Sequence, residues 1–519
     1  MSTPTVAEAP PDTTIDPAID SAAIPPAASH AERSNEPSGR RAAEDLLAKR
    51  RLVVVSNREP YRRVEVDGDT VWQRTTGGLV TALDPVMRRC HGTWIAWEPN
   101  SENGEGSREK VPGEPPRFTL RRVPLLRAEV ERYYDGMANN ALWPLCHYFV
   151  DRCHFDQEQW REYVEINRRF ADAVVAEAGD DDLVWIHDYH FCLLPELVRE
   201  RGVRSPIAFF LHIPFPAREL FQIFPWRREL LTGLLGADLV GFHSPSHADH
   251  FVACCRDLLG AEVDPAGRTI RWQGRTVRAG AFPIGIDVEA FAELAGEPAI
   301  AARSEEIREH LQGGKLIFGV DRLDYSKGIP ARLHAIDALF EAHPEHRRRV
   351  TFVQVAVPSR SRVREYREIK SRIDELIGRI NGRHGDAEWQ PIRYSNDALP
   401  RAELVAHYLA ADVALVTPLR DGMNLVALEF CACRPNEDGV LVLSEFAGAA
   451  EHLCAGALVV NPFAVHEVAE ALHRALTMEP DEQARRIRAA REQVFGNDER
   501  RWMESVLAAI AEGVDSWAA

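Results

Sequence analysis

The sequence predicts an α/β protein made of two Rossmann-like domains, each a parallel sheet covered by helices. Three observations support this prediction. Short apolar runs rich in β-branched residues recur in both halves of the 519-residue chain. Helical stretches separate these runs, which favours crossover connections between parallel strands. Polar residues suited to binding phosphates and sugars directly follow several of these runs. Open α/β sheets bind ligands at the carboxyl ends of their strands, which is where these residues would lie.

Composition limits the classes of function. The chain is 45% hydrophobic and 27% charged, as in ordinary globular proteins. Its net charge of -17 argues against a general nucleic-acid binder or a protein of anionic membranes. No apolar run is long enough to span a membrane, and no signal-peptide pattern opens the chain. The nine cysteines show no zinc-binding spacing, so we expect reduced thiols and a cytoplasmic location.

The chain divides into four predicted parts. Residues 1–45 are rich in Pro, Ala, Ser and Thr and are predicted to be a disordered tail, with a short charged helix near 42–51. Residues 46–290 form the first Rossmann-like domain, and residues 291–495 form the second. Residues 496–519 are expected to form a helix that folds back onto the first domain.

Apolar runs and a turn signal define the strands of the first domain. A hairpin is predicted over residues 64–72, because the sequence alternates around the turn signal Asp67-Gly68. The other expected strands are residues 52–57, 93–97, 183–187, 207–211 and 234–242.

Polar side chains follow several of these strands. Arg58 follows the strand expected at residues 52–57, Asp188 the strand at 183–187 and His212 the strand at 207–211. A histidine after a buried strand and before a proline-fixed turn is either structural or part of a site. The turn Gly77-Gly78 opens a helix and could let backbone N–H groups approach a phosphate, although a simple loop explains it as well.

Aromatic residues accompany these positions. Trp97 lies at a strand end, where an aromatic ring can face a sugar. Tyr134 and Trp143 belong to an aromatic-rich helical stretch, most of which we interpret as core packing.

The second domain repeats the alternation of strands and helices. Strands are expected at residues 315–320, 350–357, 413–417, 440–444 and 458–461. Arg322 and Lys327 follow the first of these, ahead of a glycine. Two cations at the carboxyl end of a parallel strand suit a phosphate or diphosphate. The alternative is a surface turn with two solvated charges.

Three further positions add to this chemistry. Arg360 follows the second strand of this domain. Asp421 stands where a helix N-cap is expected, and that helix start offers N–H donors to an anion. Glu429, eight residues later, is either a ligand for a ribose diol or a solvated helix carboxylate.

Together these residues predict two anion sites across an interdomain cleft. Arg322 and Lys327 could neutralise a leaving diphosphate without a metal, while Arg58, Arg360 and the Gly77-Gly78 turn could bind a second anion. This pattern implies a nucleotide-linked donor and a phosphorylated acceptor. The carboxylate run Asp180-Asp181-Asp182 precedes a strand and is interpreted as a solvated turn, not a metal motif.

The sequence resembles the trehalose-6-phosphate synthase family, retaining glycosyltransferases of GT-B architecture with two Rossmann-like domains facing a cleft. The resemblance runs from about residue 52 to the C-terminus. It is carried by VVVSNR, TTGGL, WIAW, YYDGMANNALWP, WIHDYH, FFLHIPFP, FPIGI, DRLDYSKG, RINGRHG, TPLRDGMNLVALE and SEFAGAA. Together these motifs are highly specific, whereas no single one would be.

The resemblance implies roles for matching residues. The acceptor site would comprise Arg58, Trp97, Tyr134, Trp143, Asp188 and Arg360. The donor site would comprise Gly78, His212, Arg322, Lys327, Asp421, Gly422, Met423, Asn424, Leu425, Val426 and Glu429. Among these, Arg322, Lys327, His212 and Asp421 would form the catalytic set.

The implied reaction moves glucose from a nucleoside-diphosphate glucose, with UDP-glucose as the expected donor, to glucose-6-phosphate. It yields trehalose-6-phosphate, with retention of α configuration and without a metal or other cofactor. The departing phosphate oxygen would accept the proton of the acceptor hydroxyl. The sequence does not fix the nucleotide base. It also leaves the oligomeric state open, and a homo-oligomer is compatible with it.

Two alternatives remain. The Arg58-Glu59-Pro60-Tyr61 segment also resembles glucosylglycerol-phosphate synthase, which uses ADP-glucose and glycerol-3-phosphate, and Leu428 stands where the family often has lysine. Tyr134 and Trp143 favour a hexose phosphate instead. A catalytically silent, sugar-phosphate-sensing relative would be expected to lose Arg322, Lys327 or His212, and all three are present.

Overall fold

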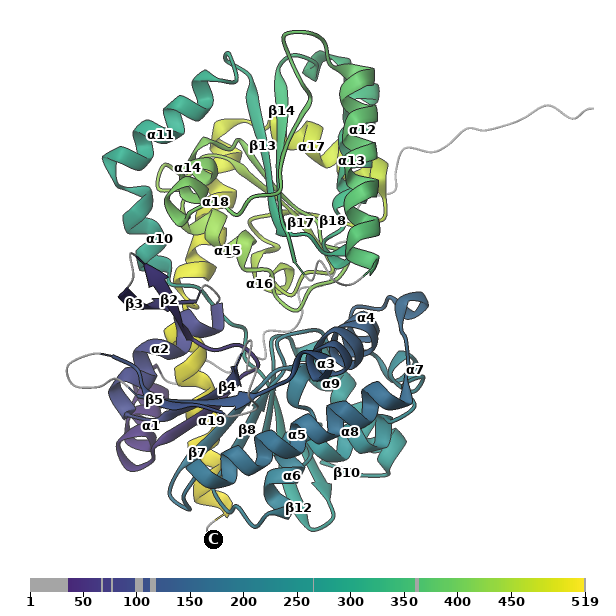
Figure 1. The fold of residues 1–519 in the computed structure, drawn as a ribbon. Helices are drawn as coiled ribbons and strands as arrows, with labels where there is room; N and C mark the ends of the chain where they lie inside the picture. Colours follow the sequence, from purple (N-terminus) through teal and green to yellow (C-terminus); the bar gives the residue numbers. More distant parts are fainter. Residues whose placement is uncertain are drawn as a thin grey trace, which may run out of the picture.

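The structure is a computed structural model in which the chain forms two α/β lobes, one above the other in Figure 1. It describes residues 36–66, 69–75, 78–98, 106–112, 118–264, 266–359 and 364–517. We call the lobe that contains the ten-stranded sheet the N-terminal lobe, and the lobe that contains the six-stranded sheet the C-terminal lobe.

The N-terminal lobe has a mostly parallel sheet in the order β10-β11-β12-β9-β8-β7-β1-β4-β6-β5. Its central strands are fully buried and β-branched or aromatic, as expected for strands covered on both faces. The strands are β1 Leu52–Val55, β4 Thr93–Glu98, β5 Arg108–Lys110, β6 Thr119–Pro124, β7 Leu183–His187, β8 Ile207–Phe210, β9 Leu239–Phe242, β10 Glu262–Val263, β11 Thr269–Trp272 and β12 Arg275–Ala281. A separate hairpin pairs β2 Tyr61–Val66 with β3 Asp69–Arg74.

Helices cover this sheet and connect its strands. The α-helices are α1 Glu36–Lys49, α2 Gly78–Cys90, α3 Arg127–Val130, α4 Trp143–Cys146, α5 Gln157–Glu177, α6 Leu194–Glu200, α7 Arg218–Phe221, α8 Arg227–Leu234 and α9 Pro245–Cys254. Two π-helical segments, η1 Glu131–Leu142 and η4 Cys255–Leu259, and two 3₁₀ turns, η2 Val150–Arg152 and η3 Tyr189–Phe191, complete the lobe.

The C-terminal lobe has a fully parallel sheet in the order β15-β14-β13-β16-β17-β18. Its strands are β13 Lys315–Arg322, β14 Val350–Val357, β15 Ile392–Ser395, β16 Val413–Val416, β17 Val440–Ser444 and β18 Leu458–Val460. Its helices are α10 Val288–Ala295, α11 Pro298–Glu309, α12 Ile329–Ala342, α13 Arg364–His384, α14 Arg401–Ala410, α15 Leu425–Ala432, α16 Ala450–Leu453, α17 Val465–Thr477 and α18 Pro480–Phe495, with 3₁₀ turns η5 Tyr325–Lys327 and η6 Pro344–His346.

The last helix, α19 Glu499–Trp517, returns to the N-terminal lobe, as the yellow helix in the lower part of Figure 1 shows. It contacts α1, α2 and β9. Trp502 is fully buried there, with its ring 5.4 Å from that of Trp185 and 5.2 Å from that of Phe210. Burying three large rings accounts for the return, since each removes about 150–250 Å² from water.

The structure corrects two details of the predicted organisation. Residues 36–45, expected to be tail, lie in α1, whose Ala43 and Leu46 are buried in the core that α19 completes. The strand expected from residue 234 begins at Leu239, because Leu234 is the last residue of α8. Residues 1–35 of the expected disordered tail and the turn residues 67, 68 and 77 lie outside the described residues. Across the part of the chain that is described, none of the helices is both long and apolar enough to span a membrane.

Candidate functional site

Residues that follow strands of both sheets meet where the two lobes touch. Gly422, which follows β16, packs against the main chain of His212, which follows β8. A Cβ at Gly422 would overlap the carbonyl oxygen of His212, so only glycine permits this approach. Arg322, the last residue of β13, places its guanidinium 5.5 Å from the ring centroid of Trp143 in the N-terminal lobe. These four predicted residues therefore meet at the boundary between the lobes.

Lys327 lies at the centre of the C-terminal side. Its ammonium group donates a hydrogen bond to Oδ2 of Asp421, and both side chains are largely buried. The turn that positions it begins at Asp324, whose Oδ1 accepts the N–H of Ser326 at 2.9 Å. Gly328 ends the turn with φ +69°, and a Cβ there would lie 2.6 Å from the carbonyl oxygen of Thr417. This glycine is required for both its backbone conformation and its close packing.

A buried arginine supports this turn from behind. Arg332 is almost fully buried and donates to Oδ2 of Asp321 at 2.6 Å and to Oε1 of Gln354 at 2.8 Å. It also donates to Thr417 at 3.2 Å, which ties α12 to the loop that leads toward Asp421. Burial raises the pKa of Asp321, although the Arg332 and Lys327 cations oppose that effect. Sequence reasoning missed Arg332, because a helical arginine is usually a solvated surface residue.

Asp421 is held as an anion. Burial alone would raise its pKa, but the charge of Lys327 and its hydrogen bond outweigh burial, so the pKa lies below its ordinary value. Asp421 is not the helix cap that the sequence predicts. Asn424 takes that position, with φ 87° and its Oδ1 accepting the N–H of Ala427 at 3.4 Å. The amide of Asn424 donates to Oδ2 of Asp421 at 3.1 Å, which joins the cap to the charged pair.

Glu429 lies on α15, the helix that Asn424 caps. Its Oε2 accepts the hydroxyl of Tyr408 at 2.8 Å. Burial raises the pKa of Glu429 to about 7, against the opposing effects of Tyr408 and Arg401. The carboxyl group is therefore not the solvated helix carboxylate that the sequence left as an alternative. Leu425 and Val426 form the first turn of the same helix and are partly buried against the core, while Met423 is buried ahead of it.

Stacked rings form the N-terminal side. The ring of Trp143 lies 4.1 Å from that of His147 and 5.7 Å from that of Tyr189. Burial lowers the pKa of His147 to about 4, so this imidazole is neutral near pH 7. The guanidinium of Arg322 lies over the ring of Trp143, an arrangement typical of a cation–π contact.

A second group of rings lies beside the end of β1. Arg58 is exposed and donates to the hydroxyl of Tyr134 at 3.4 Å. The Tyr134 ring lies 5.7 Å from Trp97 and is stacked on His190, also at 5.7 Å with 10° between the planes. These contacts bring together Arg58, Trp97 and Tyr134, three of the residues that the resemblance assigns to the acceptor site.

His212 belongs to a cluster of neutral histidines. Its Nε2 lies 3.2 Å from Nδ1 of His187, and its ring lies 5.2 Å from that of His243. Burial, reinforced by these two neighbours, lowers the pKa of His212 well below its ordinary value. The backbone N–H of His212 donates to Oδ1 of Asp188 at 3.2 Å, and Asp188 has φ 77°. His243 could have been predicted, because it follows buried strand β9 just as His212 follows β8.

Three predicted positions are not joined to this constellation by described contacts. Arg360 and Gly77 lie outside the described residues, and Gly78 is the first residue of α2. The sequence predicts that the run Asp180-Asp181-Asp182 is solvated, but its last residue is not. Asp182 is buried and accepts hydrogen bonds from Arg51 at 2.7 and 3.2 Å, so it is a structural anchor.

The arrangement pairs two cations with neutral hydrogen-bonding groups and aromatic surfaces. Arg322 and Lys327 offer positive charge at the boundary between the lobes. His212 and Asp421 are held by neighbours in defined orientations. Such preorganised charge can stabilise a leaving anion without rearrangement.

Comparisons with known proteins show which family this chain belongs to. The family model described as Glycosyltransferase family 20 matches residues 50–512. The chain is 44% identical over 476 residues to a trehalose-6-phosphate synthase of Mycolicibacterium gilvum, covering 89% of this chain and 94% of that one. It is 42% identical over 441 residues to the 56 kDa subunit of the UDP-forming α,α-trehalose-phosphate synthase of Kluyveromyces lactis, covering 83% and 90% of the two chains.

Solved structures show the same likeness. A structure described as trehalose-6-phosphate from E. coli bound with UDP-2-fluoro glucose matches with a TM-score of 0.82 and 36% identity, covering 89% of this chain and 99% of that one. The α,α-trehalose-phosphate synthase of Burkholderia xenovorans in complex with glucose-6-phosphate matches with a TM-score of 0.81 and 36% identity over the same shares. The predicted α/β architecture of GT-B type is confirmed.

Proposed function

Because this chain belongs to glycosyltransferase family 20, the family of its trehalose-6-phosphate synthase relatives, we propose that it transfers glucose from UDP-glucose to glucose-6-phosphate and so forms trehalose-6-phosphate. The observation that carries the proposal is the contact of the Arg322 guanidinium with the ring of Trp143 in the opposite lobe, together with the Lys327–Asp421 pair, whose residues follow the neighbouring strands β13 and β16. Relatives named as UDP-forming favour the uridine nucleotide.

The donor half of the proposed site belongs mainly to the C-terminal lobe. Arg322 and Lys327 neutralise the diphosphate, and the backbone of Gly78 approaches it from the N-terminal lobe. Asp421 and His212, with the main chain of residues 422–424, hold the hydroxyls of the donor glucose. Glu429 binds the ribose diol, and Leu425 and Val426 flank the nucleotide.

The acceptor half belongs mainly to the N-terminal lobe. Arg58 and Arg360 supply positive charge to the phosphate of glucose-6-phosphate. The rings of Trp97, Tyr134 and Trp143 provide apolar faces and polar edges for the sugar. Asp188 accepts a hydrogen bond from a hydroxyl of the acceptor.

The proposed chemistry is transfer with retention and without a metal. The bond between the donor's anomeric carbon and its phosphate oxygen breaks while the acceptor hydroxyl approaches from the same face. The departing phosphate oxygen takes the hydroxyl proton, so no side-chain nucleophile or base is needed. Arg322 and Lys327 stabilise the charge that develops on the diphosphate. The nine free thiols suit a reducing, cytoplasmic compartment.

The residues that suggested a glycerol-phosphate acceptor have structural partners instead. Glu59 is buried and accepts a hydrogen bond from Arg122 at 2.6 Å, and the hydroxyl of Tyr61 donates to Asp84 at 2.9 Å. Leu428 is buried in the core. None of these three side chains reports on the acceptor, so they do not support the alternative.

A turnover matrix tests the proposed function. UDP-, ADP- and GDP-glucose are each combined with glucose-6-phosphate and glycerol-3-phosphate, and product is identified by mass. We expect the UDP-glucose and glucose-6-phosphate pair to give the highest kcat/KM. Arg322→Ala should abolish this turnover, whereas Arg372→Ala, which removes an exposed arginine on α13, should not. Preference for glycerol-3-phosphate, or full activity in Arg322→Ala, would overturn the proposal.

A further inference from the structure

His187 is a buried histidine to which the proposed reaction assigns no role. It is the last residue of β7, which pairs in parallel with β8, the strand that ends two residues before His212. Its Nδ1 lies 3.2 Å from Nε2 of His212. The next residue, Asp188, accepts the backbone N–H of His212 through Oδ1 at 3.2 Å. The end of β7 therefore holds both the ring and the main chain of His212.

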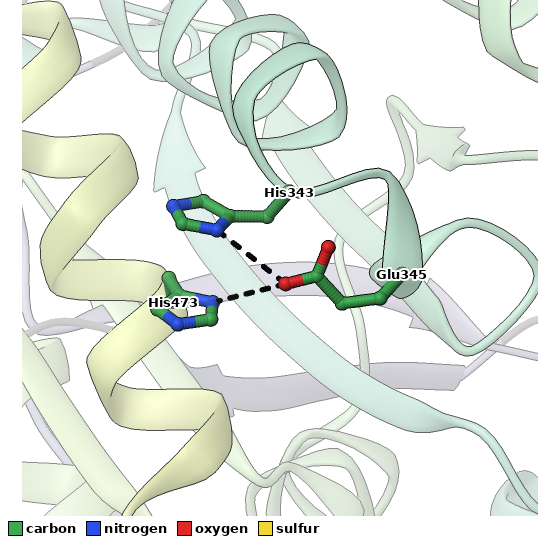
Figure 2. A group of neighbouring side chains, drawn as sticks. All are labelled: His343, Glu345 and His473. Atoms are coloured by element: carbon green, nitrogen blue, oxygen red, sulfur yellow. Dashed lines mark ion pairs between the residues drawn. The ribbon is translucent and has the colours of Figure 1, made fainter.

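The rings of His187 and His212 meet edge to edge. Their centroids lie 5.4 Å apart with 27° between the planes, while the facing nitrogens are only 3.2 Å apart, as in an N–H···N hydrogen bond. The rings of His343 and His473 in the C-terminal lobe show the contrast. They are stacked 3.7 Å apart and nearly parallel, and each pairs with Glu345 (Figure 2). Stacked rings do not share a proton, whereas the edge-to-edge pair does.

Both imidazoles of the edge-to-edge pair are neutral near pH 7. Burial lowers the pKa of His187 to about 3. Burial, reinforced by the neighbouring histidines, lowers the pKa of His212 well below its ordinary value. A neutral imidazole carries one proton, so one of its nitrogens donates and the other accepts. The ring that supplies the shared proton therefore fixes the tautomer of both rings.

The surroundings of His187 determine which ring donates. Its Nε2 is buried and has no hydrogen-bond partner within the described residues. The indole N–H groups of Trp185 and Trp502 are also buried without a described partner. The Trp185 ring lies 4.9 Å from that of His187 and 5.4 Å from that of Trp502, so donors are in excess here. A proton on Nε2 of His187 would add another unpaired donor, whereas a proton on Nδ1 is used in the bond to His212.

This choice makes His212 a donor at its other nitrogen. When His187 donates through Nδ1, Nε2 of His212 accepts, and the one proton of the neutral His212 ring lies on its Nδ1. His212 is partly exposed, so it is the ring of the pair that a ligand can reach. Asp421, the other side chain proposed to hold the donor glucose, is an anion and can only accept. A sugar hydroxyl both donates and accepts, so the two residues offer complementary groups.

We propose that His187 is a positioning residue that holds His212 in the Nδ1–H tautomer, so that His212 donates a hydrogen bond to a hydroxyl oxygen of the donor glucose. The identity of the sugar rests on the proposed function, whereas the tautomer does not. His187 itself is fully buried and acts only through the ring of His212. Its role resembles that of a triad carboxylate, which fixes the tautomer of a catalytic imidazole.

The tautomer is tested by NMR on the free, full-length protein. The histidine rings are labelled with ¹⁵N, and long-range ¹H–¹⁵N spectra separate protonated from unprotonated ring nitrogens. The signals of His212 are assigned by their loss in His212→Gln. We expect Nδ1 of His212 to carry the proton in the wild type, and His187→Leu to lose this preference. Because no substrate is needed, this result is independent of the turnover matrix that tests the proposed function.

Two substitutions of similar size separate positioning from packing. His187→Asn keeps an N–H donor near the place of Nδ1, whereas His187→Leu keeps only the bulk of a side chain. The value of kcat/KM for UDP-glucose should fall by about tenfold or more in His187→Leu and by less in His187→Asn. A packing role alone predicts the reverse order, because a buried leucine costs less than a buried amide. Thermal unfolding of both variants measures that packing effect separately.

His346→Leu gives the control. His346 is also buried, and its Nε2 lies 3.0 Å from Nδ1 of His473, but it precedes β14, at the end of the sheet opposite Arg322. Its kinetic constants should match those of the wild type. A proton on Nε2 of His212 in the wild type, or a His187→Leu enzyme at least as active as His187→Asn, would overturn the inference.

Discussion

The two halves of the candidate site are built from different interactions. In the C-terminal lobe, buried charges are paired with one another: Lys327 with Asp421, and Arg332 with Asp321. In the N-terminal lobe, rings stack on rings, with Tyr134 on His190 as one example. The C-terminal half therefore presents fixed charges, and the N-terminal half presents aromatic rings and neutral imidazoles.

This difference follows the chemistry that each half would serve. A leaving diphosphate gains charge during the reaction, and preorganised cations stabilise it most when they do not have to reorient. The paired carboxylates Asp421 and Asp321 hold the cations in place at the cost of burying charge. An acceptor sugar changes its charge little, so ring faces and single hydrogen bonds suffice to position it. The predictions below test whether the two halves are separable.

The largest effect is expected at the charged half. Lys327→Ala removes the ammonium group that Asp421 orients, and we expect kcat to fall by about 10³-fold, as when a preorganised donor is lost. Steady-state kinetics with UDP-glucose and glucose-6-phosphate measure this. Because Lys327→Ala leaves the buried charge of Asp421 without its cation, thermal unfolding of the same variant separates lost charge from lost stability.

A lysine outside the site gives the control. Lys370 is half exposed on α13 and pairs with Asp374, so Lys370→Ala should keep the wild-type rate. If Lys327→Ala also kept a rate within a few-fold of wild type, the charged half would not carry the chemistry.

The next effect should come from forcing the halves apart. Gly422→Ala places a Cβ against the carbonyl oxygen of His212, and neither backbone can yield without separating the lobes. We expect kcat/KM to fall by about 100-fold, since displacements near 1 Å can cost that much. Gly378→Ala is the matched control, because nothing lies within 4 Å of that added methyl group and α13 gains helix propensity. Equal activity in the two variants would show that the lobes act independently of this contact.

Much of the fold was predictable from local pattern. The strands 183–187, 350–357 and 440–444 begin and end where their apolar runs do. The edge strands β5 and β10, and β11 next to β10, were not predicted, because they are short and largely polar. They pair with strands nearby in the chain, β5 with β6, β10 with β11 and β11 with β12, but their polar residues do not show the apolar pattern that marks the buried strands.

The candidate site likewise contains residues that could be predicted from the sequence and contacts that could not. Arg322 and Lys327 could be found because strand-end cations are visible in the sequence. The capping role of Asn424 could not, because it depends on a positive φ and on Asp421 already being paired with Lys327. The stack of Tyr134 on His190 needs the π-helical η1 to face the turn after β7. Such contacts belong to tertiary structure, not to spacing along the chain.

A smaller effect is expected at the acceptor half. Arg58 is exposed. If it binds the acceptor phosphate as we propose, Arg58→Ala removes one charge-assisted hydrogen bond, worth about 1.5–3 kcal/mol. KM for glucose-6-phosphate should rise by about tenfold or more, while KM for UDP-glucose stays near the wild-type value. Arg62→Ala, an exposed arginine of the β2–β3 hairpin that bonds Gln73, should change neither constant. A matching rise in the donor KM would show that the halves are not separable.

The smallest effect should be a pH dependence confined to the donor half. The pKa of Glu429 is raised from 4.5 to about 7, so between these values the native state holds a proton that the unfolded chain has released. Stability contributed by the neutral carboxyl group is therefore lost as pH rises through this window, and Glu429→Gln should remove that loss.

If the ionised carboxylate binds the ribose diol, KM for UDP-glucose should fall severalfold between pH 6 and pH 8. Glu429→Gln should flatten this profile, and Tyr408→Phe should move it to higher pH, because the Tyr408 hydroxyl opposes the raised pKa. A profile that Glu429→Gln leaves unchanged would assign the titration to another group and remove Glu429 from the donor half.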